Sequence, residues 1–282
     1  MPEKTAPNKT STTPTAAKPA PDFSQEPVVY ESIHTAMRYE NDGDGFRETR
    51  ARIHVQTDSG LALAGQLLFN YNSENETVEI RSVRVLKPDG TSVTTGPENI
   101  QDLSAPVAQV APVYSDARQK HVTVSGLSVG DTIEYDVITN SKLLDPGQFW
   151  QTYSFESNAI TLDEELELNV PKDRPLKMKS PDGVAPEVRE EGDRRVYHWK
   201  TSNLTVPKSA EMLTSFNIDV RHMLEGQHPP LPPRVTFSTF RSWAEVGNWY
   251  AGLERDRREP TPAVRAKADE IVHGKTNDTE KA

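Results

Sequence analysis

Residues 115–155 read SDARQKHVTVSGLSVGDTIEYDVITNSKLLDPGQFWQTYSF, and this stretch decides the fold that the sequence predicts. In three runs, at residues 122–124, 133–137 and 149–155, apolar side chains alternate with polar ones. Such alternation is typical of β-strands that turn one face to a core. The segments between the runs contain glycines, an aspartate and an Asp-Pro-Gly triplet, all of which favour tight turns. The stretch therefore predicts three successive strands.

The same β pattern recurs before and after this stretch. A hairpin turn through Asp44-Gly45 and the turn Lys87-Pro88-Asp89-Gly90 each separate two strand-like runs. In residues 76–86 the apolar positions change phase, which one β-bulge would explain. Residues 162–170 alternate leucine and valine with acidic residues, so we expect a strand with a solvated acidic face at a sheet edge. The further strands are predicted at residues 29–39, 48–57, 91–94, 195–200 and 234–240.

Composition excludes several classes of function. The 282 residues include 42 acidic and 32 basic side chains, and the net charge of −10 at pH 7 works against a nucleic-acid partner or an anionic membrane. The chain has no cysteine, which rules out disulfides, thiolate metal sites and a cysteine nucleophile within it. Its histidines never fall at a metal-ligand spacing, and it has neither a G-x-S-x-G motif nor a glycine-rich phosphate loop. We therefore expect no metal and no cofactor.

Both ends of the chain differ from the middle. Residues 1–27 are rich in proline, threonine, alanine and lysine, and predict a disordered leader without the apolar stretch of a secretory signal. No apolar run is long enough to span a membrane. From residue 241 the spacing of apolar residues changes to that of helices. We predict one helix after Ser242 and a second after Thr261 that ends at Gly274.

In order and spacing, these features resemble the domain of unknown function that precedes transglutaminase-like domains in many bacterial proteins. The resemblance covers residues 28 to about 240. It is carried by the following pieces: Tyr30-Glu31, Asp44-Gly45, Lys87-Pro88-Asp89-Gly90, Ser115-Asp116-Ala117-Arg118, the strand from Gly130 to Tyr135, Gly147 to Phe155, and Trp199.

The resemblance implies a mainly β protein, with an immunoglobulin-like two-sheet β-sandwich at residues 28–240 and an α-helical stub at 241–282. The stub would be the start of a truncated transglutaminase-like domain, whose cysteine, histidine and aspartate would lie further downstream. The partner implied is that domain of the same full-length chain. A periplasmic or extracellular location is expected, because the leader resembles the spacer of an exported protein.

Four residues are candidates for interaction or structural roles. Asp116 and Arg118 precede a strand at i, i+2 spacing, so both can lie on one side of the chain. They would either bind a peptide or glycan, or form an ion pair that anchors the loop at residues 97–118. Trp150 and Tyr153 would either contribute to an aromatic platform for sugars or pack in the core and at its rim.

Three functions remain open from the sequence. We favour a non-catalytic accessory or interaction module of a larger bacterial transglutaminase-like protein. The alternative is the substrate-cleft part of a thiol-dependent hydrolase or protein-crosslinking enzyme whose catalytic residues lie beyond residue 282. A carbohydrate-binding sandwich acting alone is the third, and an inward-facing Trp150 would count against it.

Overall fold

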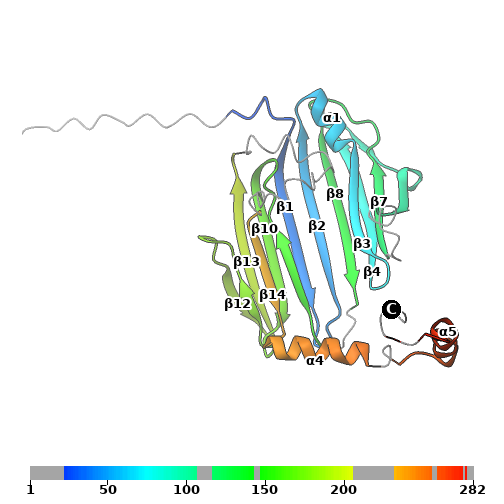
Figure 1. Ribbon diagram of the computed structural model, residues 1–282. Coiled ribbons are helices and arrows are strands. Elements are labelled where there is room, and N and C mark those ends of the chain that lie inside the picture. Colours follow the sequence, from blue (N-terminus) through cyan, green and yellow to red (C-terminus); the bar gives the residue numbers. More distant parts are fainter. Residues whose placement is uncertain are drawn as a thin grey trace, which may run out of the picture.

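The computed structural model describes residues 22–106, 116–142, 147–205, 232–255, 259–275 and 277. In this part of the chain the strands form one large sheet and two small ones (Figure 1). The large sheet has the order β12-β13-β10-β1-β2-β8-β4-β5. Its strands are β1 (Val28–Tyr39), β2 (Gly45–Val55), β4 (Glu76–Leu86), β5 (Ser92–Thr94), β8 (Thr132–Ser141), β10 (Ile160–Pro171), β12 (Glu187–Glu191) and β13 (Arg194–Asn203).

The two small sheets have three strands each. The β3-β7-β6 sheet consists of β3 (Gln66–Asn72), β7 (Ala117–Thr123) and β6 (Ile100–Ser104). The β11-β14-β9 sheet consists of β11 (Lys177–Lys179), β14 (Arg234–Ser238) and β9 (Trp150–Ser154). The three strands predicted in residues 115–155 are thus confirmed as β7, β8 and β9, and each belongs to a different sheet. This stretch ties the three sheets together.

Both small sheets pack on the same face of the large sheet. One apolar cluster joins Met37, Leu166 and Trp199 of the large sheet to Phe237 of β14. A second cluster joins Ile53, Val85 and Ile133 of the large sheet to Val122 of β7. All these residues are almost fully buried, as the alternation of strand side chains between two faces requires. The other face of the large sheet carries charged side chains.

At the centre of the large sheet, β1 pairs with β2 in antiparallel fashion and with β10 in parallel fashion. The β1–β2 pair confirms the predicted hairpin, and a register shift between Ile80 and Ser82 confirms the predicted bulge in β4. The edge position expected for residues 162–170 is wrong, because β10 lies between β13 and β1. Its alternation reflects one core face and one charged face rather than an edge.

The mainly β class is confirmed, whereas the layering is more divided than predicted. The second layer consists of two small sheets rather than one, and an immunoglobulin-like topology stays a prediction. Sequence patterns indicated a turn of helix within residues 97–112, which is the 3₁₀ turn Pro97–Asn99, but they missed the short helix α1 (Asp58–Ala64) and four strands, β3, β6, β11 and β12. The leader at residues 1–21 and the prolines Pro229 and Pro230 lie outside the described residues.

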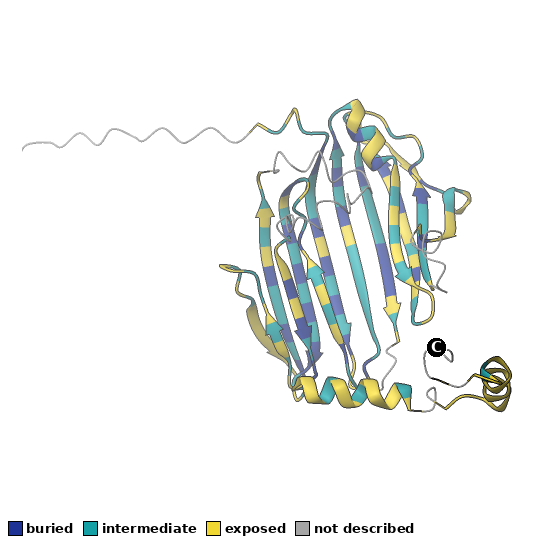
Figure 2. Cartoon of the chain, in the orientation of Figure 1, coloured by how far each residue is buried: buried dark blue, intermediate teal, exposed yellow. Residues whose placement is uncertain are grey.

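Two helices follow β14. In α4 (Trp243–Glu254) Ser242 accepts a hydrogen bond from the Glu245 amide at 3.2 Å, as the capping sequence predicts. In α5 (Pro262–Val272) Thr261 caps the first turn and Pro262 is the first residue. Neither helix has a buried residue, and Figure 2 shows both as mostly exposed. None of the described helices is long and apolar enough to cross a membrane.

Candidate functional site

A cleft of about 570 Å³ opens between the two small sheets, above the inner face of the large sheet. Its floor is formed by β1, β2 and β8, where threonine hydroxyls mix with aliphatic side chains. One wall is formed by β3 and the other by the end of β9 and the residues that follow it. The lining residues that the argument below uses are Thr35, Arg47, Thr49, Leu68, Phe69, Asn70, Tyr135, Tyr153, Glu156 and Glu164.

A buried carboxylate organises one end of the cleft. Glu164 of β10 is only 2% exposed, and it accepts hydrogen bonds from the Tyr153 hydroxyl at 2.7 Å and from the Glu156 amide at 2.9 Å. Burial raises the pKa of Glu164, although these two hydrogen bonds oppose the rise. Burial and the neighbouring Glu164 carboxylate also raise the pKa of Tyr153, so its hydroxyl stays protonated as a donor. Glu164 therefore fixes the wall of the cleft.

The two ends of the cleft differ in charge. Arg47 of β2 pairs with Met37 of β1 in the sheet register, whereas Glu164 pairs with Ile33 of β1. These levels are four residues apart on β1, which corresponds to about 13 Å along the strands. Within the described part of the chain, no carboxylate forms an ion pair with Arg47. The cleft therefore has a cationic end at Arg47 and an acidic end at Glu164 and Glu156.

The middle of the cleft is polar and aromatic. The hydroxyls of Thr35 and Thr49 lie 3.3 Å apart, and Thr35 also lies 3.4 Å from the Tyr153 hydroxyl. Phe69 on the β3 wall packs edge to face on Tyr135 of the floor, with ring centroids 5.5 Å apart. Burial raises the pKa of Tyr135 to about 12, and the Arg47 charge counteracts part of this rise. These groups can hydrogen-bond and pack on a ligand.

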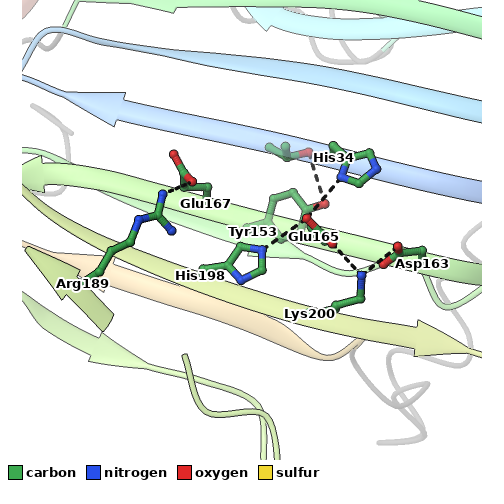
Figure 3. Close-up of polar contacts among 9 residues, drawn as sticks. His34, Tyr153, Asp163, Glu165, Glu167, Arg189, His198 and Lys200 are labelled. Carbon is green, nitrogen blue, oxygen red and sulfur yellow. Dashed lines mark hydrogen bonds and ion pairs between the residues drawn. The ribbon is translucent and has the colours of Figure 1, made fainter. Parts of the chain in front are cut away.

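The opposite, charged face of the large sheet carries a second cluster, shown in Figure 3. There His34, His198 and Lys200 point toward Glu165, whose carboxylate accepts a hydrogen bond from Lys200 at 2.6 Å. This hydrogen bond, together with the one from His198 and electrostatic attraction to Lys200 and His34, lowers the pKa of Glu165 to about 2 although burial opposes it. The described residues contain no group of three or more potential ligands placed to hold a metal ion. The Lys200 ammonium also donates to Asp163 at 2.8 Å, so it links the two carboxylates.

The predicted pair of Asp116 and Arg118 is not formed. Arg118 donates to Asp102 of β6 at 2.9 Å instead, and Asp102 also accepts from Tyr71 and Lys120. Burial of Asp102 is outweighed by these hydrogen bonds, which lower its pKa to about 2. The sequence did not predict the pairing of β7 with β6, because residues 97–112 lack the alternation of a strand. Arg118 thus links β7 to β6, outside the cleft, while Asp116 is exposed just before β7.

Trp150 and Tyr153 do not share a platform. They lie three residues apart on β9, so their side chains point to opposite faces of the strand. Tyr153 points into the cleft, whereas Trp150 contacts Phe240 and Trp249 of α4 with ring centroids 5.6 and 5.3 Å away. The structure therefore places Tyr153 in the candidate site and Trp150 under the helix.

Sequence reasoning missed Glu164 and Arg47. The alternation in residues 162–170 predicted a solvated acidic face with Glu165 and Glu167 but did not single out Glu164, which lies on the core face with Leu166. The sequence does contain a signal for this position. Glu164, Leu166 and Leu168 are two residues apart, and side chains at this spacing in a strand lie on the same face. Arg47 gave no signal, because its position in a cleft depends on strands far away in the sequence.

Two solved structures resemble this chain. A crystal structure described as a "putative protease" from Parabacteroides distasonis aligns with a TM-score of 0.69 and 19% identity over 90% of this chain. This chain spans 48% of the length of that protein. A "putative nutrient binding protein" from Legionella pneumophila aligns with a TM-score of 0.39 and 12% identity, over 88% of this chain and 80% of its own length. The first likeness shows a shared fold, and we infer nothing from the second.

Sequence comparison gives a family. No curated protein matches this chain. The family described as a domain of unknown function with a solved structure, DUF3857, matches residues 41–208. This match covers more than half of the chain and runs from the turn before β2 past the end of β13. The chain therefore belongs to the DUF3857 family.

Proposed function

We propose that this chain is the non-catalytic β module of a larger, extracytoplasmic bacterial protein, and that α4 and α5 begin a transglutaminase-like domain. In this arrangement residues 28–240 form the module and residues 241–282 the start of the next domain. The module holds that domain, or its substrate, in position. The family match at residues 41–208 supports the β module, and the resemblance of residues 241–274 to the opening of a transglutaminase-like domain supports the second part of the proposal.

The observation that carries the proposal is the bare apolar surface of α4 and α5. Trp243 is 89% exposed, and Tyr250, Val264 and Ile271 are all more than half exposed. Exposed apolar side chains gathered on consecutive helices are typical of a surface that another protein part covers. Of the apolar residues of α4, only Trp249 has a described aromatic contact with the β module, to Trp150 and Phe240. A following domain of the same chain would cover the rest.

The test is to sequence the gene beyond codon 282 and to measure the intact mass of the product from its native cell. The proposal expects the reading frame to continue into a cysteine followed by a histidine and an aspartate. A native product whose mass ends at Ala282 would contradict it. So would a longer product in which the exchange rates of α4 amides equal those in the 282-residue chain, because α4 would then have no new partner.

The cleft favours a second candidate function. If the following domain is a thiol-dependent hydrolase or a protein-crosslinking enzyme, the cleft between β3 and β9 would contribute to its substrate site. The chain itself has no cysteine, so any thiolate would come from the following domain. The measurement that separates the two candidates is the KM of the complete protein: a substrate role predicts that Arg47→Met raises KM with little change in kcat.

A further inference from the structure

Two free strand edges border the cleft. In the described residues, β3 and β9 are each the outermost strand of a small sheet, with a neighbour on one side only. Leu68 and Asn70 of β3 and Ser154 of β9 line the cleft. An unpaired strand edge presents a row of backbone N–H and C=O groups to which another strand can add.

The hydrogen-bond register of β3 shows which of its groups are free. At the two ends of the β3–β7 pair, the Val124 amide donates to the Gly65 carbonyl and the Ser73 amide to the Asp116 carbonyl, both at 2.9 Å. The odd-numbered residues of β3 therefore point their backbone groups toward β7. In an antiparallel pair the backbone groups of alternate residues point in opposite directions. The even-numbered residues Leu68 and Asn70 therefore point their N–H and C=O groups to the open edge.

The edge of β9 offers less. The odd-numbered residues of β9 point their backbone groups toward β14. The Thr239 amide donates to the Phe149 carbonyl at 3.0 Å, and the Phe155 amide donates to the Pro233 carbonyl at 2.8 Å. Of the even-numbered residues, Thr152 already donates its amide to the side chain of Gln151 at 2.9 Å. β3 is thus the better template, and β9 closes the cleft on the far side with Tyr153.

We propose that the cleft binds an extended polypeptide that adds to the edge of β3 as a β-strand and places an acidic side chain on Arg47. The inference does not depend on the domain that follows α5, because every group involved belongs to the β module. Backbone bonds to Leu68 and Asn70 would supply sequence-independent affinity, and the Arg47 guanidinium would supply selectivity for a carboxylate.

The dimensions and charges of the cleft fit this occupant. A distance of about 13 Å between the Arg47 level and the Glu164 level corresponds to four residues of an extended chain. Glu156 at the other end can accept hydrogen bonds from a polar or cationic group of the peptide. Thr35 and Thr49 on the floor provide hydroxyls for a strand that lies above β2.

The first experiment measures the binding of Val-Thr-Val-Asp-Val-Thr-NH2, labelled with fluorescein on its N-terminal amine, to the full 282-residue chain by fluorescence polarisation. A matched peptide carries asparagine in place of aspartate, and chitotetraose serves as a glycan probe. We expect the aspartate peptide to bind about tenfold more tightly than the asparagine peptide, equivalent to ~1.4 kcal/mol. Equal binding of the two peptides, or binding of chitotetraose alone, would overturn the inference.

Two N-methylated peptides test strand addition. In one the amides of residues 2 and 4 are methylated, and in the other those of residues 3 and 5. A strand that pairs with β3 alone points one of these sets at β3 and the other away from it. We expect one peptide to lose binding and the other to keep it. Equal loss or no loss in both would show that the ligand is not a one-sided β-strand.

The protein variants complete a double-mutant cycle. Arg47→Met should weaken binding of the aspartate peptide about tenfold and leave binding of the asparagine peptide unchanged. The reason is that the change in the protein and the change in the peptide remove the same contact. Arg50→Met is the matched control: Arg50 lies on the same strand but on the opposite face, where it pairs with Glu48 and Asp136. Urea unfolding of both variants checks that the fold is retained. An equal effect of the two variants would overturn the placement of the acidic side chain.

Discussion

At the scale of single residues, Glu164 shows how a polar group is held in the interior of this protein. Its two oxygens accept from Tyr153 and from the Glu156 amide, so neither is left without a donor. Buried carboxylates are tolerated when their hydrogen bonds are made, and they destabilise the fold when a partner is lost. Glu164 thus connects β10 to the residues that follow β9.

Glu164→Gln should lower the free energy of unfolding by about 1 to 3 kcal/mol, because an amide cannot accept both hydrogen bonds. Urea unfolding at pH 7 measures this difference. Glu167→Gln on the same strand is the control. Glu167 lies on the charged face and pairs with the exposed Arg189, so its loss should change stability by no more than about 0.5 kcal/mol. Equal effects of the two changes would be evidence against the buried role.

Glu165 gives the protein a pH dependence of known sign. Its pKa in the folded state is lowered from 4.5 to about 2, chiefly by the hydrogen bond from Lys200. A depressed carboxyl pKa stabilises the folded state above the unfolded pKa, and this contribution is lost as the pH falls from about 4.5 toward 2. Because Lys200 is exposed, we expect the lowered pKa of Glu165 to contribute no more than about 1 kcal/mol to the free energy of unfolding. Glu165→Gln should be less stable than the parent at pH 7, with the two curves converging near pH 2.

The site could be predicted from the sequence only in part, and the residues show why. Tyr153 was found because alternation marks β9, but its partner Glu164 was not singled out. Arg118 was found, yet its partner is Asp102 because β6 and β7 are neighbours in the small sheet. Contacts between strands that are far apart in sequence decide these partners, and strand periodicity does not report them.

At the scale of elements, α4 contacts the β module through an aromatic cluster. Trp249 contacts Trp150 and Phe240, with ring centroids 5.3 and 5.7 Å away. In Figure 1, α4 runs across the ends of the strands of the large sheet. The rest of the helix surface is largely exposed. Trp249 is therefore expected to hold the helix against the module.

Trp249→Ala should release α4 from the module. Loss of the aromatic contacts corresponds to about 1 to 3 kcal/mol of local stability, so the amides of α4 should exchange about ten to a hundred times faster. Hydrogen exchange followed by mass spectrometry of peptides covering residues 243–254 measures this. Trp243→Ala removes a tryptophan that is 89% exposed, and it should leave exchange unchanged. A slow-exchanging helix in Trp249→Ala would contradict the role of Trp249 in holding α4.

Elements with strong periodicity were predictable and others were not. β1, β2, β8 and β10 each have one mainly apolar face, which the sequence displays directly. β12 reads EVREE and is exposed throughout, so no core pattern marks it and only its pairing with β13 makes it a strand. β3 does alternate Leu67, Phe69 and Tyr71 on its inner side, a usable pattern that was overlooked.

At the scale of the whole molecule, the β domain and the two helices should differ in resistance to proteolysis. The sheets bury two extensive apolar clusters, whereas α4 and α5 bury no residue. Limited digestion of the 282-residue chain should remove residues 241–274 and leave a stable product that ends near Phe240. Mass spectrometry of the products decides the outcome. Survival of α5 for as long as the sheets would show that the helices form a stable unit of their own.

The parallel pairing of β1 with β10 has a consequence for synthesis. β10 ends more than a hundred residues after β1, so a ribosome that adds about 5 to 20 residues per second needs on the order of ten seconds to supply it. During that interval one edge of β1 lacks its neighbour and the centre of the large sheet stays open. Pairings between distant strands also form slowly, because a long loop must close first. This protein should therefore depend on chaperones that bind extended, unpaired strands until β10 arrives.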